Sequence, residues 1–319
     1  MVIMAGPKKK RKQNSEKRAK NTGIAPPAGP PHQHATTIAE AVDDVWHDAH
    51  GHGELEVPVS VVAALALLAP PAQQRDEVAG ELIAMDADRF ATFMRTQWAI
   101  FVNARPDLVN RVWPLMRPWH GERPLGDLAT RAAKRVAGVA LQRAQLHLTG
   151  DADLRGSTDL LGKVLTLLRG PKAAQARGQF YTPTSVTDTI ARLLGPPQEG
   201  QTVHEPAAGS GGMLRAAAQA MREHGRDPAT VTWIAVDIDE EAIACLAVNV
   251  VLWGLGPRVL LGVGDSLSHD WMERAEAERR ETLELAQQVR RHKTVLRALQ
   301  NLEPPDRQPE SEQDSSASP

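Results

Sequence analysis

The sequence predicts an α/β protein in which an all-helical domain precedes a short parallel sheet and a long C-terminal helix. Helical periodicity runs from residue 34 to residue 170, and no convincing alternating strand occurs before residue 200. After residue 171, short β-branched runs alternate with helical stretches, which is typical of parallel strands joined by crossover helices. We therefore expect two structured regions of different character.

Changes in composition divide the chain further. We expect a disordered basic arm (1–33), a helical domain (34–170), a core that contains the sheet (171–271), a long helix (272–302) and a disordered acidic tail (303–319). The two tails are rich in charged residues and proline and poor in apolar residues, so they cannot bury enough surface to fold.

Local signals place the elements within these segments. The capping box of Thr37 and Glu40 predicts the start of the first helix, whose buried face carries Ile38, Val42 and Trp46. Further helices are expected near 59–69, 74–85, 87–104, 124–148 and 158–169. Strands are expected at 202–204, 231–236 and 259–263, separated by helices at 212–223 and 239–252.

The long C-terminal helix carries an apolar stripe of Leu285, Val289, Leu296, Leu299 and Leu302. Two to three heptads permit a coiled-coil contact, but packing on the chain's own domain is the preferred interpretation. Three strands also leave an exposed sheet edge, which this helix or a second subunit would cover.

Composition excludes several classes of protein. Hydrophobic residues make up 42% of the 319, charged residues 24%, and the mean hydropathy of −0.34 is that of a soluble globular chain. The single cysteine, Cys245, excludes a disulfide scaffold and a cysteine-rich zinc site, and fits a reducing cytoplasm. We expect no membrane span, and no metal site at the histidine-rich turn around residues 47–52.

Charge is strongly segregated although the net charge is only −2. The arm at 7–20 has a net charge of +7, residues 34–88 of −10 and residues 89–143 of +7. DNA is therefore an expected partner of both basic segments. The second segment also contains Trp98, Trp113 and Trp119, which we interpret as core residues in preference to a DNA-facing surface.

Four motifs carry chemical information, and they follow one another at the ends of the predicted strands. A glycine-rich block, His204 to Gly212, lies between a strand and a helix, where backbone N–H groups can approach a ligand. The string G-Q-F-Y-T-P at 178–183 precedes it. Asp237 and Asp265 end the next two strands, and the carboxyl ends of parallel strands meet at one sheet edge.

Together these motifs resemble those of the N6-adenine DNA methyltransferases, in particular the modification subunit of type I restriction–modification systems. G-Q-F-Y-T-P is similar to the family's G-x-F-[FY]-T-P, and E-P-A-A-G-S-G-G-M-L to its D-P-A-x-G-S-G-G-x-L. The resemblance covers about residues 172–271. It implies a partial Rossmann-like S-adenosylmethionine-dependent methyltransferase core and a cytoplasmic protein that acts on or with DNA.

The resemblance also assigns S-adenosylmethionine as the cofactor. It implies that Phe180 and Thr182 contact the methionine end, Asp237 the ribose, and Ile238 and Asp265 the adenine. The expected cofactor-binding residues are Gln179, Phe180, Thr182, Pro183, Glu205, Ala207, Gly209, Ser210, Gly211, Asp237, Ile238 and Asp265.

One family motif has no counterpart in this sequence. The family's catalytic [DN]-P-P-[YFW] holds the target amino group and stacks on the extruded adenine. The most similar string is Glu303-Pro304-Pro305-Asp306, which lacks the aromatic residue and reads as a helix stop. We therefore assign no catalytic residue.

Three functional hypotheses remain open. The chain is a cofactor-binding methylase relative that is catalytically incomplete alone, or an active adenine methyltransferase whose catalytic motif comes from a partner, or a non-catalytic DNA-associated regulator or scaffold. A truncated relic is a further possibility, against which the ordered apolar stripe of the last helix argues.

Overall fold

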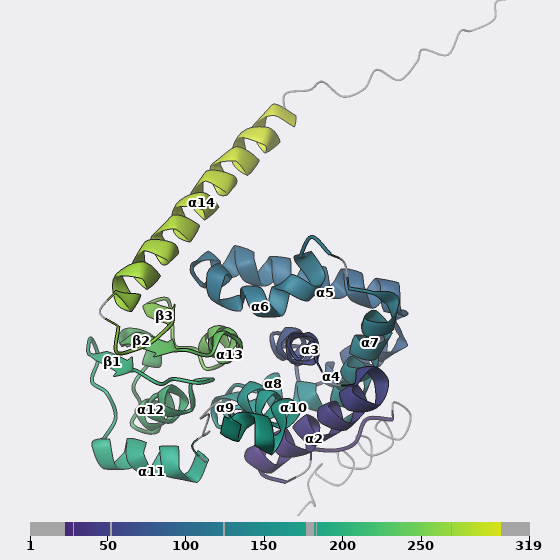
Figure 1. The fold of residues 1–319 in the computed structure, drawn as a ribbon, viewed down its shortest axis with the longest axis horizontal. Coiled ribbons are helices and arrows are strands. Elements are labelled where there is room, and N and C mark those ends of the chain that lie inside the picture. Colours follow the sequence, from purple (N-terminus) through teal and green to yellow (C-terminus); the bar gives the residue numbers. More distant parts are fainter. Residues whose placement is uncertain are drawn as a thin grey trace, which may run out of the picture.

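The computed structural model describes residues 23–300 except Ala28, His52, Pro124, residues 177–181, Pro183 and His269. The first part is entirely helical (Figure 1). Its helices are α2 (Pro31–His50), α3 (Glu56–Ala66), α4 (Arg75–Ala84), α5 (Ala87–Ala104), α6 (Val109–His120), α7 (Asp127–Gln142), α8 (Gln145–Thr149), α9 (Ala152–Gly156) and α10 (Leu160–Ala176). A 3-10 turn, η1 (Pro106–Leu108), joins α5 to α6.

The first helix begins earlier than the sequence predicts. Helix α2 starts at Pro31, and the capping-box prediction at Thr37 is wrong, since the Thr37 hydroxyl donates to the Gln33 carbonyl inside the helix. A proline at the first helical position has a φ angle already suited to the helix, so it starts α2 about two turns sooner. The predicted arm also extends too far, because Ile24 is buried and the Ala25 N–H donates to the Gln142 carbonyl at 2.8 Å.

Sequence reasoning missed helix α6 because Pro114 and Pro118 lie inside it. A proline removes one backbone hydrogen bond and costs about 3 kcal/mol in a helix interior. The apolar face of α6 offsets this cost by burying Val112, Leu115 and Trp119. The single helix expected at 124–148 is also interrupted, since the left-handed backbone of Ala144 separates α7 from α8.

The tryptophans of the basic segment are mainly core residues. Trp98 and Trp119 are buried, and both indole N–H groups donate to the Ser60 hydroxyl, at 3.0 and 2.8 Å. A buried indole needs such a partner for its N–H. Trp113 differs, because it is 41% exposed. The preference for core residues is thus correct for Trp98 and Trp119 and wrong for Trp113.

The second part contains the predicted parallel sheet. Strands β1 (Thr202–Glu205), β2 (Thr232–Asp237) and β3 (Val259–Val263) lie in the order β1-β2-β3, with Glu205 opposite Ala235 and Asp237 opposite Val263. Helix α11 (Thr184–Leu194) precedes β1, α12 (Gly212–Glu223) joins β1 to β2, and α13 (Glu240–Leu252) joins β2 to β3. The predicted α/β class, with helices first and a partial sheet after them, is confirmed.

The last helix, α14 (Trp271–Gln300), buries apolar side chains on the body along its first turns, and further along it Arg290 donates to the Asn103 carbonyl of α5 at 3.0 Å. Trp271 and Ala275 are buried beside β3, and Arg111 of α6 donates to Leu261 O at 2.8 Å and pairs with Glu278. The helix then extends away from the body (Figure 1). Leu285 is 59% exposed and Val289 41% exposed, so the expectation that this stripe packs on the chain's own domain is wrong for these residues.

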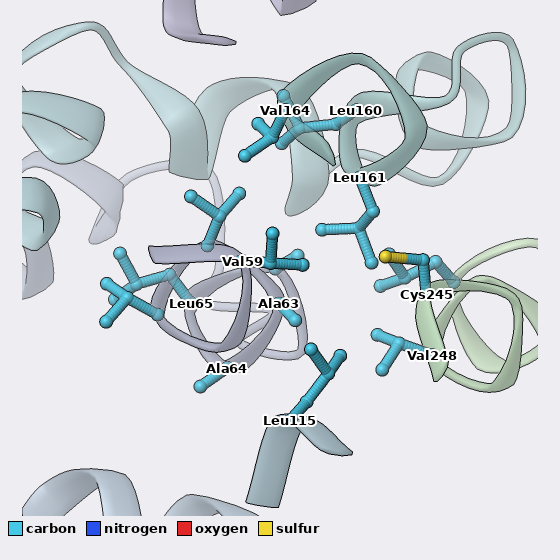
Figure 2. Packing of buried hydrophobic residues seen from close by; sticks show 14 of the residues in the cluster. Val59, Ala63, Ala64, Leu65, Leu115, Leu160, Leu161, Val164, Cys245 and Val248 are labelled. Carbon is cyan, nitrogen blue, oxygen red and sulfur yellow. The ribbon is translucent and has the colours of Figure 1, made fainter. Parts of the chain in front are cut away.

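The two parts share one hydrophobic core, with helix α13 between them. Figure 2 shows Cys245 and Val248 of α13 facing Val59 and Ala63 of α3 and Leu161 of α10. All five side chains are at most 1% exposed. Helix α13 is buried on nearly every side, and after Glu240 and Glu241 in its first turn its residues are apolar except for Asn249. Among the helices that the structure describes, none is long and apolar enough to cross a bilayer.

The buried thiol of Cys245 provides a test of this shared core. Burial raises the pKa of Cys245 well above its ordinary value, and the thiolate is the reactive form. We expect a disulfide exchange reagent to label the native protein only at the rate at which the core opens, and to label the unfolded chain at once. Rapid stoichiometric labelling of the native protein, measured against a sample in denaturant, would contradict the packing of α13 between the two parts.

Candidate functional site

The candidate site lies at the carboxyl ends of β1 and β2. A loop, residues 206–211, follows β1, and Asp237 ends β2. The Asp237 carboxylate accepts the N–H of Gly209 at 2.7 Å and the N–H of Asp239 at 2.9 Å. The Gly264 N–H after β3 donates to the Asp237 carbonyl at 2.9 Å. Asp237 therefore connects the loops that follow all three strands.

The loop at residues 206–211, called the glycine loop below, is shaped by close packing as well as by the conformational freedom of its glycines. Gly211 has φ +97°, and a Cβ there would lie 2.4 Å from Leu246 Cδ1 and 3.0 Å from Trp253 Cζ3. Only glycine permits this conformation and this close approach to α13. The Ser210 and Ala208 side chains are buried on the same side, so the loop is held tightly over the core.

A cavity of about 540 Å³ opens between this loop and the helical part. Its volume lies within the range of small-molecule sites. The cavity is lined by Thr36, Asp159, Gly162, Lys163, Thr166, Leu167, Thr182, Thr184, Thr187, Ala207, Ala208, Gly209, Ser210, Gly212, Met213, Arg215, Asp237, Ile238, Asp239 and Ala242.

Six of the predicted site residues line this cavity together. They are Thr182, Ala207, Gly209, Ser210, Asp237 and Ile238. Ile238 is the most informative, because its side chain is 76% exposed although it follows a buried strand. An isoleucine left open inside a cavity offers an apolar surface to a ligand.

The other predicted site residues lie elsewhere. Glu205 lines a second cavity, of about 400 Å³, beside β1, and burial raises the pKa of its carboxyl group. Gly211 packs on α13, and Asp265 accepts the Leu267 N–H in a turn after β3, outside both cavities. Gln179, Phe180 and Pro183 lie outside the described residues. The binding roles of all these residues stay predictions.

Sequence reasoning missed the opposite wall of the main cavity, which is one face of helix α10. Asp159, just before its start, and Gly162, Lys163, Thr166 and Leu167 recur at helical spacing and line the cavity together. The periodicity of the 158–169 stretch predicts that they share a face. Nothing in the sequence indicates that this face meets a glycine loop 40 to 50 residues later.

The buried carboxylate of Asp159 holds the glycine loop against α10. It accepts hydrogen bonds from the Ser210 hydroxyl at 2.6 Å, the Gly162 N–H at 2.9 Å and the Asn249 amide at 3.0 Å. Asn249, in α13, also donates to the Ser210 carbonyl at 2.9 Å. Burial raises the pKa of Asp159, and these hydrogen bonds oppose the rise. One acidic side chain thus joins three segments that lie far apart in the sequence.

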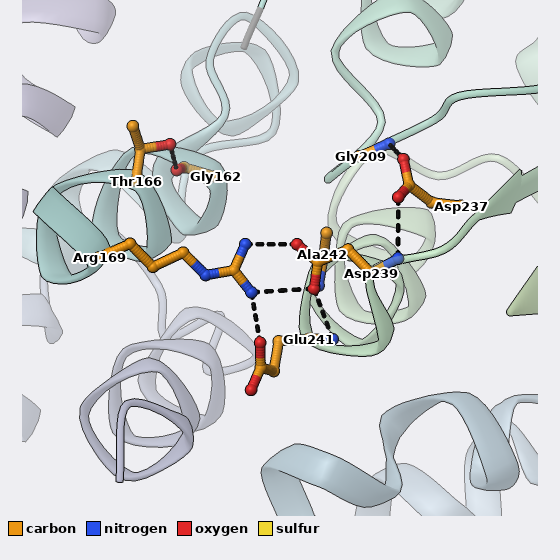
Figure 3. A network of polar contacts seen from close by, with 8 residues as sticks. All are labelled: Gly162, Thr166, Arg169, Gly209, Asp237, Asp239, Glu241 and Ala242. Carbon is orange, nitrogen blue, oxygen red and sulfur yellow. Dashed lines mark hydrogen bonds and ion pairs between the residues drawn. The ribbon is translucent and has the colours of Figure 1, made fainter. Parts of the chain in front are cut away.

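A second polar connection joins the turn of α10 just before its kink at Gly170 to the start of α13 (Figure 3). The Arg169 guanidinium, 1% exposed, contacts both carboxylate oxygens of Asp239, one of them at 2.8 Å, and also pairs with Glu241. Asp239 caps α13 by accepting the Ala242 N–H at 3.2 Å. Burial opposes the ionisation of Asp239, but its bonds to Arg169 and to backbone N–H groups outweigh this, and its pKa is lowered.

A third polar contact, an ion pair, positions the helix that follows Thr182. Arg215 of α12, 2% exposed, pairs with Asp188 of α11 and donates to the Ser157 carbonyl at 3.3 Å. Arg215 also lines the cavity. Helix α11 is therefore held beside the glycine loop by a charge contact as well as by packing.

Among the described residues, no cluster of three or more histidine, cysteine, aspartate or glutamate side chains is arranged to hold a metal ion. His47 pairs with Asp43 and His50 with Glu54, while His52 lies outside the described part of the chain. Glu303 and Asp306, which bound the proline pair of the tail, also lie outside it.

Comparison with known proteins supports the motif assignment. Residues 157–284 match the family model described as N-6 DNA Methylase, which confirms the resemblance that the motifs predict. Among solved structures, the chain is similar to the type I restriction-modification system methyltransferase subunit from Streptococcus thermophilus, with 17% sequence identity and a TM-score of 0.39. The match covers 75% of this chain but only 60% of that subunit. Among curated proteins, none matches.

The buried contact between Arg169 and Asp239 should dominate the stability of the site. Replacing Arg169 with methionine leaves a buried carboxylate without its partner, which costs about 3 to 5 kcal/mol of unfolding free energy. The control is Arg135→Met, which breaks the exposed pair with Asp48 and should cost less than about 1 kcal/mol. Urea unfolding of both variants measures the difference. Equal losses would contradict this assignment.

The same pair predicts a pH dependence. A carboxylate with a lowered pKa in the folded state contributes stability that is complete above its unfolded pKa and is lost as the pH falls through the folded value. We therefore expect the stability difference between the wild type and Arg169→Met to shrink as the pH is lowered below about 4, near the ordinary aspartate pKa. A difference that grows on acidification would contradict the lowered pKa of Asp239.

Proposed function

Residues 157–284 match the N-6 DNA methylases, and on that premise we propose that this chain binds S-adenosylmethionine in the cavity between the glycine loop and α10. One observation carries the proposal. Gly209, Asp237 and Ile238, which the motifs assign to this cofactor, line one cavity of about 540 Å³. When bound, the cofactor supplies a methyl group activated on a sulfonium, and the chain's own residues bind and orient it.

The environment of Asp237 fits a ribose. Each of its two carboxylate oxygens accepts one backbone N–H, from Gly209 and from Asp239. Because a carboxylate has about four lone-pair sites, each oxygen keeps capacity for one more donor. A vicinal diol presents two hydroxyl groups to such a fixed carboxylate. The exposed face of Ile238 then lies next to it for the apolar adenine ring.

We further propose that the chain does not complete methyl transfer alone. The sequence contains no [DN]-P-P-[YFW] string with which to hold an extruded adenine, and in the alternative form of the proposal a partner chain supplies that element. The outer edge of β1 supports a protein partner, because no described strand pairs with it and Thr202 and His204 are exposed. The basic segments 7–20 and 89–143 favour DNA as the other partner.

A DNA-associated regulator or scaffold is the second candidate function. It is favoured by the missing catalytic tetrapeptide and by the exposed Leu285 and Val289 of α14. In this function the cofactor cavity would serve as a sensor of the ligand. The two candidates differ in whether a partner that carries the tetrapeptide produces methyl transfer.

The exposed side chain of Ile238 tests the cofactor site without disturbing the fold. We expect Ile238→Ala to weaken S-adenosylmethionine binding about fivefold to tenfold, the worth of roughly 1 kcal/mol of lost apolar contact, with an unchanged melting temperature. The matched control is Ile100→Ala, at an isoleucine of α5 that is 56% exposed and away from the cavity. Calorimetric titration measures both. Equal affinities of the two variants would place the ligand elsewhere.

Methyl transfer is tested separately with labelled S-adenosylmethionine and mixed-sequence duplex DNA. We expect the purified chain alone to leave adenine N6 unlabelled, because its sequence contains no [DN]-P-P-[YFW] string to position the target amino group. Addition of a partner chain that carries Asn-Pro-Pro-aromatic should then produce incorporation if the enzyme is split. Incorporation by the chain alone would contradict catalytic incompleteness.

A further inference from the structure

Lys163 is a charged residue of the cavity wall that no motif assigns. It lies on α10, one turn after Asp159, and lines the cavity with Gly162 and Thr166. One helical turn rises about 5.4 Å, so Lys163 lies one turn along α10 from the position at which Asp159 holds the glycine loop. The residue is partly buried.

The acidic side chains that line the cavity already have partners. Asp159 accepts from Ser210, Gly162 and Asn249, and Asp239 pairs with Arg169. Asp237 accepts two backbone N–H groups. None of these three carboxylates is in contact with Lys163.

The two cationic residues of the lining differ from each other. Arg215 pairs with Asp188 and the Ser157 carbonyl. Lys163 forms no side-chain hydrogen bond or ion pair with any residue that the structure describes. An ammonium that lines a cavity and has no protein partner can bind an anionic ligand group through a charge-assisted hydrogen bond.

We propose that Lys163 binds the carboxylate of the methionine part of S-adenosylmethionine. This inference rests on the proposed function and extends it to the end of the cofactor opposite the adenine. The carboxylate is the cofactor's only anionic group, whereas its sulfonium and ammonium would be repelled by a lysine. The hydroxyl of Thr182, which the motifs assign to the same methionine end, lines the same cavity.

The placement of the remaining charges agrees with this orientation. Asp237 and Ile238 mark the ribose and adenine end at the tip of β2, and Lys163 approaches from the facing helix. A ligand that reaches from Ile238 across the glycine loop to α10 spans the cavity from the sheet to the helical wall. The helical part of the chain would therefore select cofactors that carry an amino-acid carboxylate.

Calorimetric titration with two ligands tests the proposal on the full chain. S-Adenosylhomocysteine carries the carboxylate, and 5′-methylthioadenosine keeps the adenine, ribose and sulfur but lacks the amino-acid group. We expect Lys163→Met to weaken S-adenosylhomocysteine binding about 10- to 100-fold, the range for one charge-assisted hydrogen bond, and to leave 5′-methylthioadenosine binding unchanged. Lys163→Arg should retain most of the affinity, and Lys293→Met, on the exposed surface of α14, is the control.

The possible outcomes are distinguishable. Equal affinity of the wild type and Lys163→Met for S-adenosylhomocysteine overturns the role of Lys163 while the proposed function stands. A loss for both ligands also overturns it, because the variant then damages the whole cavity. If Lys163→Met loses affinity only for a short DNA duplex, the lysine contacts phosphate instead. If the wild type binds neither ligand, the proposed function fails, and the role of Lys163 fails with it.

Discussion

The candidate site depends on the polar contacts that join helix α10 to the region of the sheet. Arg169 at one end holds Asp239 and Glu241, and Asp159 at the other holds Ser210 and Asn249. Both connections are buried, so water cannot replace a lost partner. These contacts, together with the apolar packing of α10 in the shared core, hold the second wall of the cavity over the glycine loop.

Joining two parts of a protein through buried charges costs desolvation free energy. An apolar contact of the same volume often stabilises equally well or better, because two ions must be desolvated. Hydrogen-bonded ion pairs, however, fix the relative orientation of two helices more narrowly than apolar packing does. Arg169 contacts both oxygens of a residue that also caps α13, so the rotation and the height of α10 against α13 are set together. Cavity-lining residues on α10 are thereby placed at defined positions.

In this arrangement the helical part forms one wall of the cavity. The hydrophobic core is continuous through α13, and one face of α10 with Thr36 of α2 lines the cavity opposite Asp237. A sheet region folded alone would present the glycine loop and Ile238 to open solvent. The proposed cofactor site is thus formed between two regions that are distinct in sequence character, which is where small-molecule sites commonly occur.

The sequence by itself determined the local elements of this protein. The strand at 259–263 and the helix at 212–223 are observed at the predicted residues, because alternation and periodicity report which face of an element is buried. The resemblance of its motifs to the adenine methyltransferases also assigned Gly209, Asp237 and Ile238 to one ligand, and all three line the same cavity. Helix α6 was not predicted, because Pro114 and Pro118 inside it argue against a helix. The burial of its apolar face offsets the free energy that these prolines cost.

Only the tertiary structure decided which of those residues share a cavity and what faces them. Asp265 ends a strand at the expected edge yet lies in a turn outside the cavity, whereas Asp159 and Lys163 enter it from a helix far earlier in the chain. Burial and pairing are properties of packing between distant segments, and no local pattern encodes them. The sequence therefore determined the residues that shape the loop, and the packing of α10 decided which charges of the cavity wall are paired and which one is not.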